Sequence, residues 1–207
     1  EAFDWVGSPS TWGHPQLRGT LATQNSDVVQ RYLDAGAIVF GKTNVPINLA
    51  DWQSFNKVYG TTCNPWDVTR GPGGSSGGSA AALAVGMAAL EAGSDIGSSI
   101  RNPAHYCGVY GLKPTWGVVS GQGHSLDGWE TDIDIAVTGP MARSARDLTL
   151  AFEILGGADR YTKDVWSLGC PPDPRETLAG FKVAVKLSDG VCPVDLAYQD
   201  KVAQFAT

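Results

Sequence analysis

The sequence predicts an α/β fold, because segments typical of helices and strands alternate along the chain. Residues 26–33 start with a serine suited to an N-cap and carry apolar residues one turn apart, which predicts a helix. The fully apolar run at 37–40 follows at once and predicts a short buried strand. A further strand is expected to end near 137–140. Such helix–strand units are typical of α/β proteins.

The size and composition of the chain agree with a globular core. The chain has 207 residues, of which 43% are hydrophobic and 17% charged. It can therefore bury a sizeable core in one large domain or at most two small ones. Its 15 basic and 21 acidic residues leave a net charge of −6, which argues against nucleic acid or an anionic membrane surface as the main partner.

The remaining elements of the first half follow from local signals. Gly36 is placed to end the first helix in the left-handed conformation. Residues 44–71 contain prolines and aromatic residues without clear periodicity, as expected of a segment that lines or covers a site. The alanine-rich residues 80–92 predict a helix buried on every side. Pro103 is expected to stop the small-residue turn at 93–101 from continuing as an ordinary helix.

The second half carries clearer helix signals. Ser144, with Asp147 three residues later, predicts the start of a helix that ends at Gly156. Residues 181–187 alternate apolar and polar side chains and predict a strand, and another helix is expected from about Leu196.

Cysteines and apolar runs exclude two further classes of protein. The four cysteines lie far apart and form no Cys-x-x-Cys pair, so we expect reduced, mostly structural thiols and no metal site. The apolar run at 80–90 is too short to span a bilayer.

Two glycine-containing motifs match other functions, but their surroundings do not fit. The spacing Gly36-x-x-x-x-Gly41-Lys42-Thr43 matches a phosphate-binding loop, yet its four middle residues are the apolar strand itself. Gly-Gly-Ser-Ser-Gly at 73–77 matches the nucleophile elbow of α/β hydrolases, yet no strand precedes it. A flexible Gly/Ser linker also fits poorly, because the motif joins the buried alanine-rich helix directly.

Two serines are the strongest candidates for chemistry. Ser75 and Ser99 are predicted at opposite ends of one buried helix, each in a turn rich in small residues. One hydroxyl could act as a nucleophile while the other passes on its proton. By spacing alone, this proton relay remains one hypothesis beside the two motif matches above.

The motifs around these serines resemble, in their order, the signature of the amidase signature family. Gly-Gly-Ser-Ser-Gly-Gly-Ser at 73–79 is followed by Gly-Ser-Asp-Ile-Gly-Ser-Ser-Ile-Arg-Asn-Pro at 93–103. Further matches are Gly-Lys-Thr-Asn-Val-Pro at 41–46, Asn-Pro-Trp at 64–66 and Cys-Gly-Val-Tyr-Gly-Leu-Lys-Pro-Thr at 107–115. The resemblance covers roughly residues 1–156. It implies a mixed β-sheet sandwiched between α-helices, of which residues 1–207 are the N-terminal part, without the C-terminal half.

The resemblance also implies a catalytic Ser–cis-Ser–Lys triad. Ser99 matches the nucleophile, and Ser75 matches the bridging serine that follows a cis peptide bond. The backbone amides of Ile96, Gly97 and Ser98 match the oxyanion hole, which binds the tetrahedral oxygen.

Three side chains are expected to support the nucleophile's turn. Asp95 and Arg101 flank Ser99 and are expected to form an ion pair or hydrogen bonds that buttress the turn. Ser76 is expected to support it through hydrogen bonds. Ser98 departs from the glycine that is common at its position in the family.

The lysine of the triad is not expected among residues 1–207. Aligned with the family, it falls one residue before Glu1, in the N-terminal strand. Lys42 and Lys113 match family segments in which the lysine is not the base. A lysine that acts as a base near pH 7 needs a pKa about 3 units below its ordinary value, which burial must supply.

The function implied by the resemblance is that of an amidohydrolase. It would cleave the C–N bond of a small or aryl carboxamide through a serine acyl-enzyme, with no metal and no organic cofactor. We expect a small-molecule amide as the partner, with no nucleic acid and no membrane, a cytoplasmic location, and a homodimer as the oligomer to test for.

The alternative is the glutaminase subunit of a tRNA-dependent amidotransferase, which shares the signature. Residues 49–56 weigh against it, because those subunits usually carry a Met-Asp-Glu-Phe-like segment there and this chain does not.

Residues 1–207 by themselves are expected to hydrolyse no amide, because the lysine that completes the triad lies outside them. The measurement is ammonia or amine release from a panel of amides. Turnover by this segment that disappears in a Ser99→Ala variant would contradict the expectation.

Overall fold

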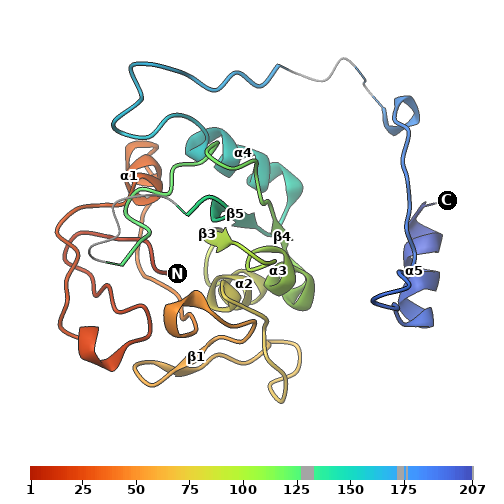
Figure 1. Ribbon diagram of the computed structural model, residues 1–207, viewed down its shortest axis with the longest axis horizontal. Helices are drawn as coiled ribbons and strands as arrows, with labels where there is room; N and C mark the ends of the chain where they lie inside the picture. The colour runs from red at the N-terminus through yellow and green to blue at the C-terminus, as the bar shows by residue number, and fades with distance from the viewer. Residues whose placement is uncertain (127–132, 172–174, 176, 207) are drawn as a thin grey trace. The chain divides into compact units, whose positions relative to one another are not determined.

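The computed structural model describes residues 1–126, 133–171, 175 and 177–206. The chain divides into two compact units, Glu1–Leu168 and Gly169–Thr207. The helices and strands of the first unit are, in chain order, α1 (Asp27–Asp34), β1 (Phe55–Asn56), β2 (Gly60–Thr61), α2 (Gly77–Ala84), β3 (Leu90–Asp95), α3 (Arg101–Cys107), β4 (Tyr110–Gly111), β5 (Val137–Ala142) and α4 (Ala145–Leu155) (Figure 1). Short 3₁₀ turns cover Pro15–Leu17 and Ile47–Leu49.

A three-stranded sheet forms the centre of the first unit. Its order is β3-β5-β4, and both pairings are antiparallel. Leu90 pairs with Ala142 and Asp95 pairs with Val137, so β3 and β5 match along their whole length. The strand expected to end near 137–140 is therefore confirmed as part of β5, and β1 and β2 form a separate small hairpin.

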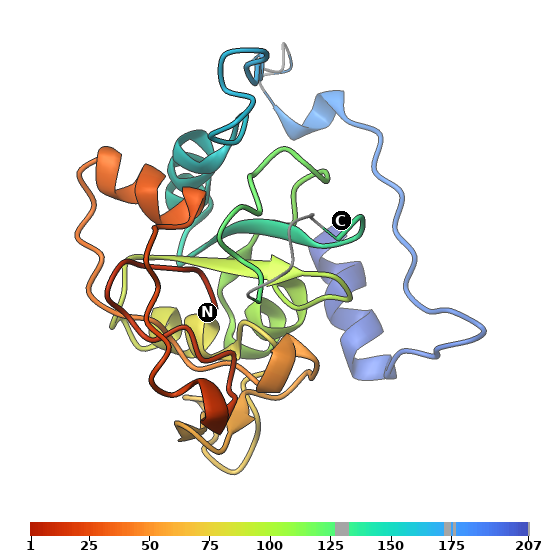
Figure 2. The ribbon, with the colours of Figure 1, turned by 60° about the vertical axis from the view of Figure 1, so that its left-hand side comes forward.

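Helices cover both faces of this sheet. On one face, α1 and α4 pack around a core that includes Val29, Ala92 and Leu155. On the other face, α2 and α3 pack around a core that includes Leu83 and Met141. Both ribbon views show the sheet between these two pairs of helices (Figures 1 and 2). The predicted α/β fold with a sheet between helices is confirmed.

The caps of α1 and α4 agree with the sequence. The hydroxyl of Ser26 accepts the amide of Val29 at 3.2 Å, and the hydroxyl of Ser144 accepts that of Asp147 at 3.1 Å. Each bond satisfies a backbone donor that has no partner inside its helix. Gly36 has a φ of +83° and follows α1 in the left-handed conformation, as predicted.

The strands predicted at 37–40 and 181–187 are absent from the structure. Neither segment has a ladder partner among the described residues. Ile38 is 86% exposed and Phe40 is 70% exposed. An apolar run becomes a strand only when another strand pairs with its backbone, and the local sequence does not reveal that partner.

The alanine-rich run at 80–92 is not one helix. It begins inside α2, which ends at Ala84, and it continues through a turn into β3. Gly86 has a φ of +75°, and its amide donates to the carbonyl of Leu83 at 3.0 Å. A left-handed glycine with such a bond ends a helix, which outweighs the helix propensity of the alanines.

Pro103 does not prevent a helix, contrary to the prediction. It lies at the third position of α3. The amides of the first turn of a helix have no intrahelical acceptor, so a proline there removes no hydrogen bond.

The second unit contains a 3₁₀ turn at Leu178–Gly180 and α5 (Leu196–Ala206), the helix expected from Leu196. None of the helices in the described part of the chain is both long and apolar enough to cross a membrane.

Two glycines with the same backbone angle provide a test of packing near α1. Gly117 and Gly123 both have a φ of +77°, but a Cβ on Gly123 would lie 2.5 Å from the Cα of Ser26, whereas a Cβ on Gly117 meets nothing within 4 Å. Gly117→Ala should lower the free energy of unfolding by about 1 kcal/mol through backbone strain alone. Gly123→Ala should lower it by a further 1–3 kcal/mol or so, because the overpacked segment must move. Urea denaturation measures both, and equal losses in the two variants would contradict this account of the contact.

Candidate active site

The two serine turns meet because α2 and β3 run in opposite directions. Ser75 lies just before α2, and Ser99 lies just after β3. The chain therefore leaves the first turn through the helix and returns to it through the strand. The amide of Ser76 donates to the carbonyl of Ser99 at 3.1 Å. The prediction that Ser75 and Ser99 lie at opposite ends of one helix was wrong, and a helix followed by a returning strand takes its place.

Ser75 is fully buried, and its hydroxyl has no hydrogen-bond partner among the described residues. The peptide bond between Gly74 and Ser75 is cis, as the resemblance implies. Gly74 cannot carry a side chain, because a Cβ would lie 2.6 Å from the carbonyl oxygen of Asp51. A buried hydroxyl without a partner is costly, so this atom is available to a group that is not among the described ones.

Asp95 organises the turn that carries Ser99. Its buried carboxylate accepts the amide of Ser98 at 2.8 Å and that of Ile100 at 3.1 Å. The guanidinium of Arg101 donates to the same carboxylate through Nε at 3.0 Å and Nη2 at 2.8 Å. Burial alone would raise the pKa of Asp95, but these donors hold that pKa below its usual value. The expected buttress of Asp95 and Arg101 is present.

Ser76 supports the same turn from the other side. Its hydroxyl accepts the amide of Ser94 at 3.3 Å, which ties the start of α2 to β3. The Trp52 indole donates to the carbonyl of Gly97 at 2.8 Å and holds the turn from a separate loop.

The amides expected to form an oxyanion hole differ in their availability. Those of Ile96 and Gly97 have no acceptor among the described residues. The amide of Ser98 already donates to Asp95, so it is not free in this structure. Ser98 also has a φ of +78°, which is unusual for a residue other than glycine.

Both serines line a cavity of about 1020 Å³. Four tryptophans form much of its wall, and the ionisable side chains among its described lining residues are two aspartates and one histidine. These residues are Trp12, Trp52, Trp116, Trp166, Asp51, Asp159 and His124. No lysine or arginine occurs among the lining residues that the structure describes, so the wall is mostly aromatic with a negative balance of charge.

Four residues other than glycine have a left-handed backbone, and all four border this site. Trp12, Asn48 and Leu49 line the cavity with φ values of +50° to +56°, and Ser98 precedes Ser99. A side chain in this conformation costs roughly 1–2 kcal/mol, so such strain is typical of functional sites.

A buried polar pair lies beside the cavity. The carboxylate of Glu1 contacts Nε2 of His124 at 3.1 Å and accepts the hydroxyl of Ser94 at 2.9 Å. Burial raises the pKa of Glu1, but the hydrogen bonds from His124 and Ser94 together with nearby positive charge bring it below its ordinary value. Sequence reasoning missed His124, because only the fold brings it to Glu1 from 123 residues away.

The two lysines set aside in the sequence do not contact Ser75. The ammonium of Lys42 donates to the carbonyl of Pro9 at 3.0 Å, and that of Lys113 donates to Pro114 at 2.9 Å. Burial lowers the pKa of Lys42, although Asp4 and Glu1 act in the opposite direction.

Comparisons with known proteins agree with this geometry. Residues 1–207 match the family model described as Amidase. A glutamyl-tRNA(Gln) amidotransferase subunit from Methanosarcina acetivorans is 36% identical over 208 residues, which are 97% of this chain and 42% of that protein. The crystal structure of the subunit with the same name from Thermotoga maritima aligns with a TM-score of 0.70 at 36% identity, covering 77% of this chain and 34% of that one.

A third similar protein has a different printed function. The structure of 6-aminohexanoate cyclic dimer hydrolase complexed with substrate aligns with a TM-score of 0.71 at 33% identity, covering 84% of this chain and 36% of that one. The present chain thus spans about two fifths or less of the length of these proteins.

The fold, the paired serine turns and the family match define a hydrolase of the kind that acts on amide C–N bonds. The chain belongs to the amidase family, whose signature is the one that its serine turns resemble.

The network around Asp95 predicts a pH-dependent contribution to stability. Asp95→Asn should lower the free energy of unfolding at pH 7 by roughly 2–3 kcal/mol, because it weakens charge-assisted bonds at a buried group. The pKa of Asp95 is lower in the folded chain than in the unfolded one, so its contribution is present above the usual aspartate pKa and is lost as the pH falls. The variant should lack this part of the acid sensitivity.

The measurement is chemical denaturation at pH 7 and at about pH 4, the ordinary range of an aspartate. Asp67→Asn is the matched control, because Asp67 also pairs with an arginine, Arg70, but both side chains are exposed. The control should change stability little. A similar loss in both variants would contradict the special role of the buried carboxylate.

Proposed function

We propose that the protein containing this chain hydrolyses the C–N bond of a carboxamide through a serine acyl-enzyme, with Ser99 as the nucleophile and Ser75 as the bridging hydroxyl. The observation that carries the proposal is the meeting of the two serine turns on one cavity, where the buried hydroxyl of Ser75 lacks a partner among the described residues. The family match supports the reaction class.

The reaction then proceeds in two steps. A neutral lysine, expected one residue before Glu1, accepts a proton through Ser75 while the Ser99 oxygen attacks the amide carbonyl. The amides of Ile96 and Gly97 stabilise the oxyanion. The lysine's proton returns through Ser75 to the nitrogen that leaves as ammonia or an amine. Water then attacks the acyl-enzyme and frees Ser99.

The cavity supports a small or aryl carboxamide as the substrate. Its tryptophans offer flat apolar surface to a ring or an alkyl chain. We further propose that this substrate is the partner of the site, and that the enzyme acts in the cytoplasm.

A second candidate is a glutaminase subunit that supplies ammonia to protein partners in a tRNA-dependent amidotransferase. The relative from Methanosarcina acetivorans and the structure from Thermotoga maritima both carry the name of such a subunit, and these names favour this candidate over the first. The cavity wall favours the first candidate, because the described lining offers no cation to the α-carboxylate of glutamine.

Replacing either serine should test the mechanism. Ser99→Ala in the full-length protein should lower kcat by at least about 10⁴-fold, because no nucleophile remains, and Ser75→Ala should lower it by a comparable factor. The measurement is release of ammonia or amine under saturating substrate. Ser8→Ala is the control, since Ser8 does not line the cavity. Activity retained by Ser99→Ala would reject the proposed nucleophile.

The two candidate functions differ in substrate. Benzamide and acetanilide, assayed without tRNA or ATP, should release ammonia and aniline respectively if the first candidate is right. Glutamine turnover, with little turnover of the two aromatic amides, would instead support the glutaminase subunit. Absence of turnover with all three would contradict both candidates.

A further inference from the structure

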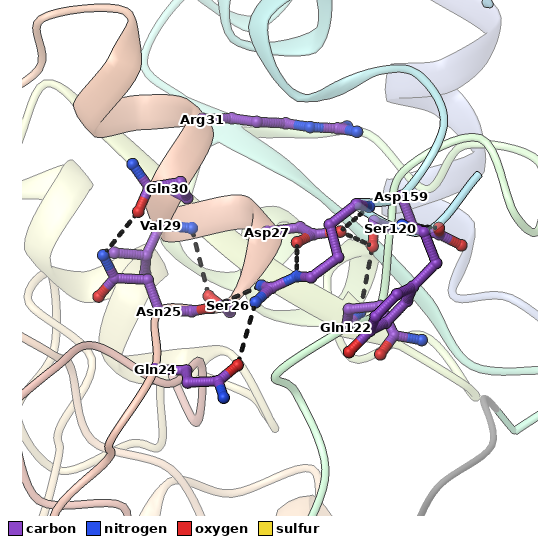
Figure 3. Close-up of polar contacts among 12 residues, drawn as sticks. Gln24, Asn25, Ser26, Asp27, Val29, Gln30, Arg31, Ser120, Gln122 and Asp159 are labelled. Atoms are coloured by element: carbon purple, nitrogen blue, oxygen red, sulfur yellow. Dashed lines mark hydrogen bonds and ion pairs between the residues drawn. The ribbon is translucent and has the colours of Figure 1, made fainter. Parts of the chain in front are cut away.

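Helix α1 holds a wall of the cavity from outside. Residues 156–166, here called the wall segment, follow α4 and carry Asp159, Thr162 and Trp166 into the lining of the cavity. Neither Asp27 nor Arg31 of α1 lines the cavity, yet both bind this region (Figure 3). They lie four residues apart and therefore share one face of the helix.

Asp27 joins the wall segment to a second cavity wall. Its Oδ1 accepts Nε of Arg160 at 2.5 Å, and its Oδ2 accepts the backbone amide of Arg160 at 3.1 Å. The same Oδ2 accepts the hydroxyl of Ser120 at 2.6 Å. Ser120 itself lines the cavity, so one carboxylate fixes two separate stretches of its lining.

The backbone adds to this junction. The amide of Asp27 donates to the carbonyl of Gln122 at 3.0 Å, and the amide of Gln122 donates to the hydroxyl of Ser120 at 3.2 Å. Arg160 Nη2 donates to the carbonyl of Asn25 at 2.6 Å. The start of α1 is thus bonded to both walls by side chains and by main chain.

Arg31 holds the other end of the junction. Its guanidinium donates to the carbonyls of Leu155, Gly157 and Ala158, the bond to Gly157 being 3.2 Å long. These carbonyls end α4 and lead into the wall segment, so Arg31 fixes the point where that segment begins. A cation at the carboxyl end of a helix is also favourable to the helix itself.

The part of the wall segment that follows is a compact turn. Oδ1 of Asp159 accepts the amides of Tyr161 and Thr162, each at 2.8 Å, and the hydroxyl of Thr162 at 3.0 Å. Such a turn keeps its own shape and moves as one piece. Its place in the cavity is therefore decided by the bonds at Arg160 and at the carbonyls of 155–158.

The burial of the two partners makes Asp27 the more critical one. The side chain of Asp27 is 7% exposed, while that of Arg160 is 32% exposed. Removing the carboxylate leaves both Ser120 and the Arg160 amide without their acceptor, whereas removing the Arg160 side chain leaves two of the three donors to Asp27 in place.

From these contacts we infer that Asp27 is a positioning residue that sets the place of the wall segment and, through Trp166, the size of the amide that the cavity accepts. The part that concerns substrates rests on the proposed function. The part that concerns the wall segment does not.

The test compares Asp27→Asn with Asp34→Asn in the full-length protein. Asp34 is at the other end of α1, where its carboxylate bonds only the side chain of Gln30 among the described residues. In Asp27→Asn, amide hydrogen exchange in residues 157–166 should become about tenfold faster or more, since the bonds that hold the segment are weakened. In Asp34→Asn that exchange should not change.

Kinetics with a small and a bulky amide, acetamide and 2-naphthamide, provide the second readout. The ratio of their kcat/KM values should change by about tenfold in Asp27→Asn, mainly through the KM of the bulky amide, while kcat for acetamide stays within about twofold. A loss of equal size for both amides would overturn the inference, because a merely structural role predicts that result. Unchanged exchange in 157–166 would overturn it as well.

Two further outcomes are decisive. If Asp27→Asn does not fold, Arg160→Gln replaces it, and the same change in exchange and in the substrate ratio is required. If the unsubstituted protein hydrolyses neither amide, nor benzamide, acetanilide or glutamine, the proposed function fails. The exchange result alone then supports or overturns the positional part of the inference.

Discussion

The close approach of the two serine turns is the constraint on which the rest of the site depends. The bond from the Ser76 amide to the Ser99 carbonyl forms only because backbone meets backbone at this point. A Cβ on Gly74 would lie 2.6 Å from a carbonyl oxygen of the loop that covers it, and a Cβ on Gly93 would lie 2.7 Å from the Ser76 hydroxyl. The glycines and serines of the signature are thus required by packing as well as by chemistry.

Local signals in the sequence predicted the elements that local interactions decide. Ser26 and Ser144 cap their helices through hydrogen bonds to residues three positions away, so the printed sequence contains the whole interaction. The run at 37–40 failed as a strand because a strand depends on a distant partner. The run at 80–92 failed as one helix because the left-handed turn at Gly86 outweighs alanine propensity.

The same distinction applies to the site. Ser75, Ser99 and Asp95 occur in short motifs, and the resemblance placed them before any coordinates. Trp52 and His124 reach the cavity from loops 45 and 123 residues away from the residues they bond, and no periodicity or motif marks them. An aromatic-rich connection at 44–71 was the one signal for Trp52, and it indicated a lining segment without naming the side chain.

The left-handed residues around the cavity link heat resistance to selectivity. Glycine would relieve the backbone at Trp12, Asn48 or Leu49, but each replacement would delete part of the cavity lining. A laboratory selection for thermal tolerance alone would therefore tend to enrich glycine at these three places. The resulting enzymes would be hardier and would discriminate less between competing amides.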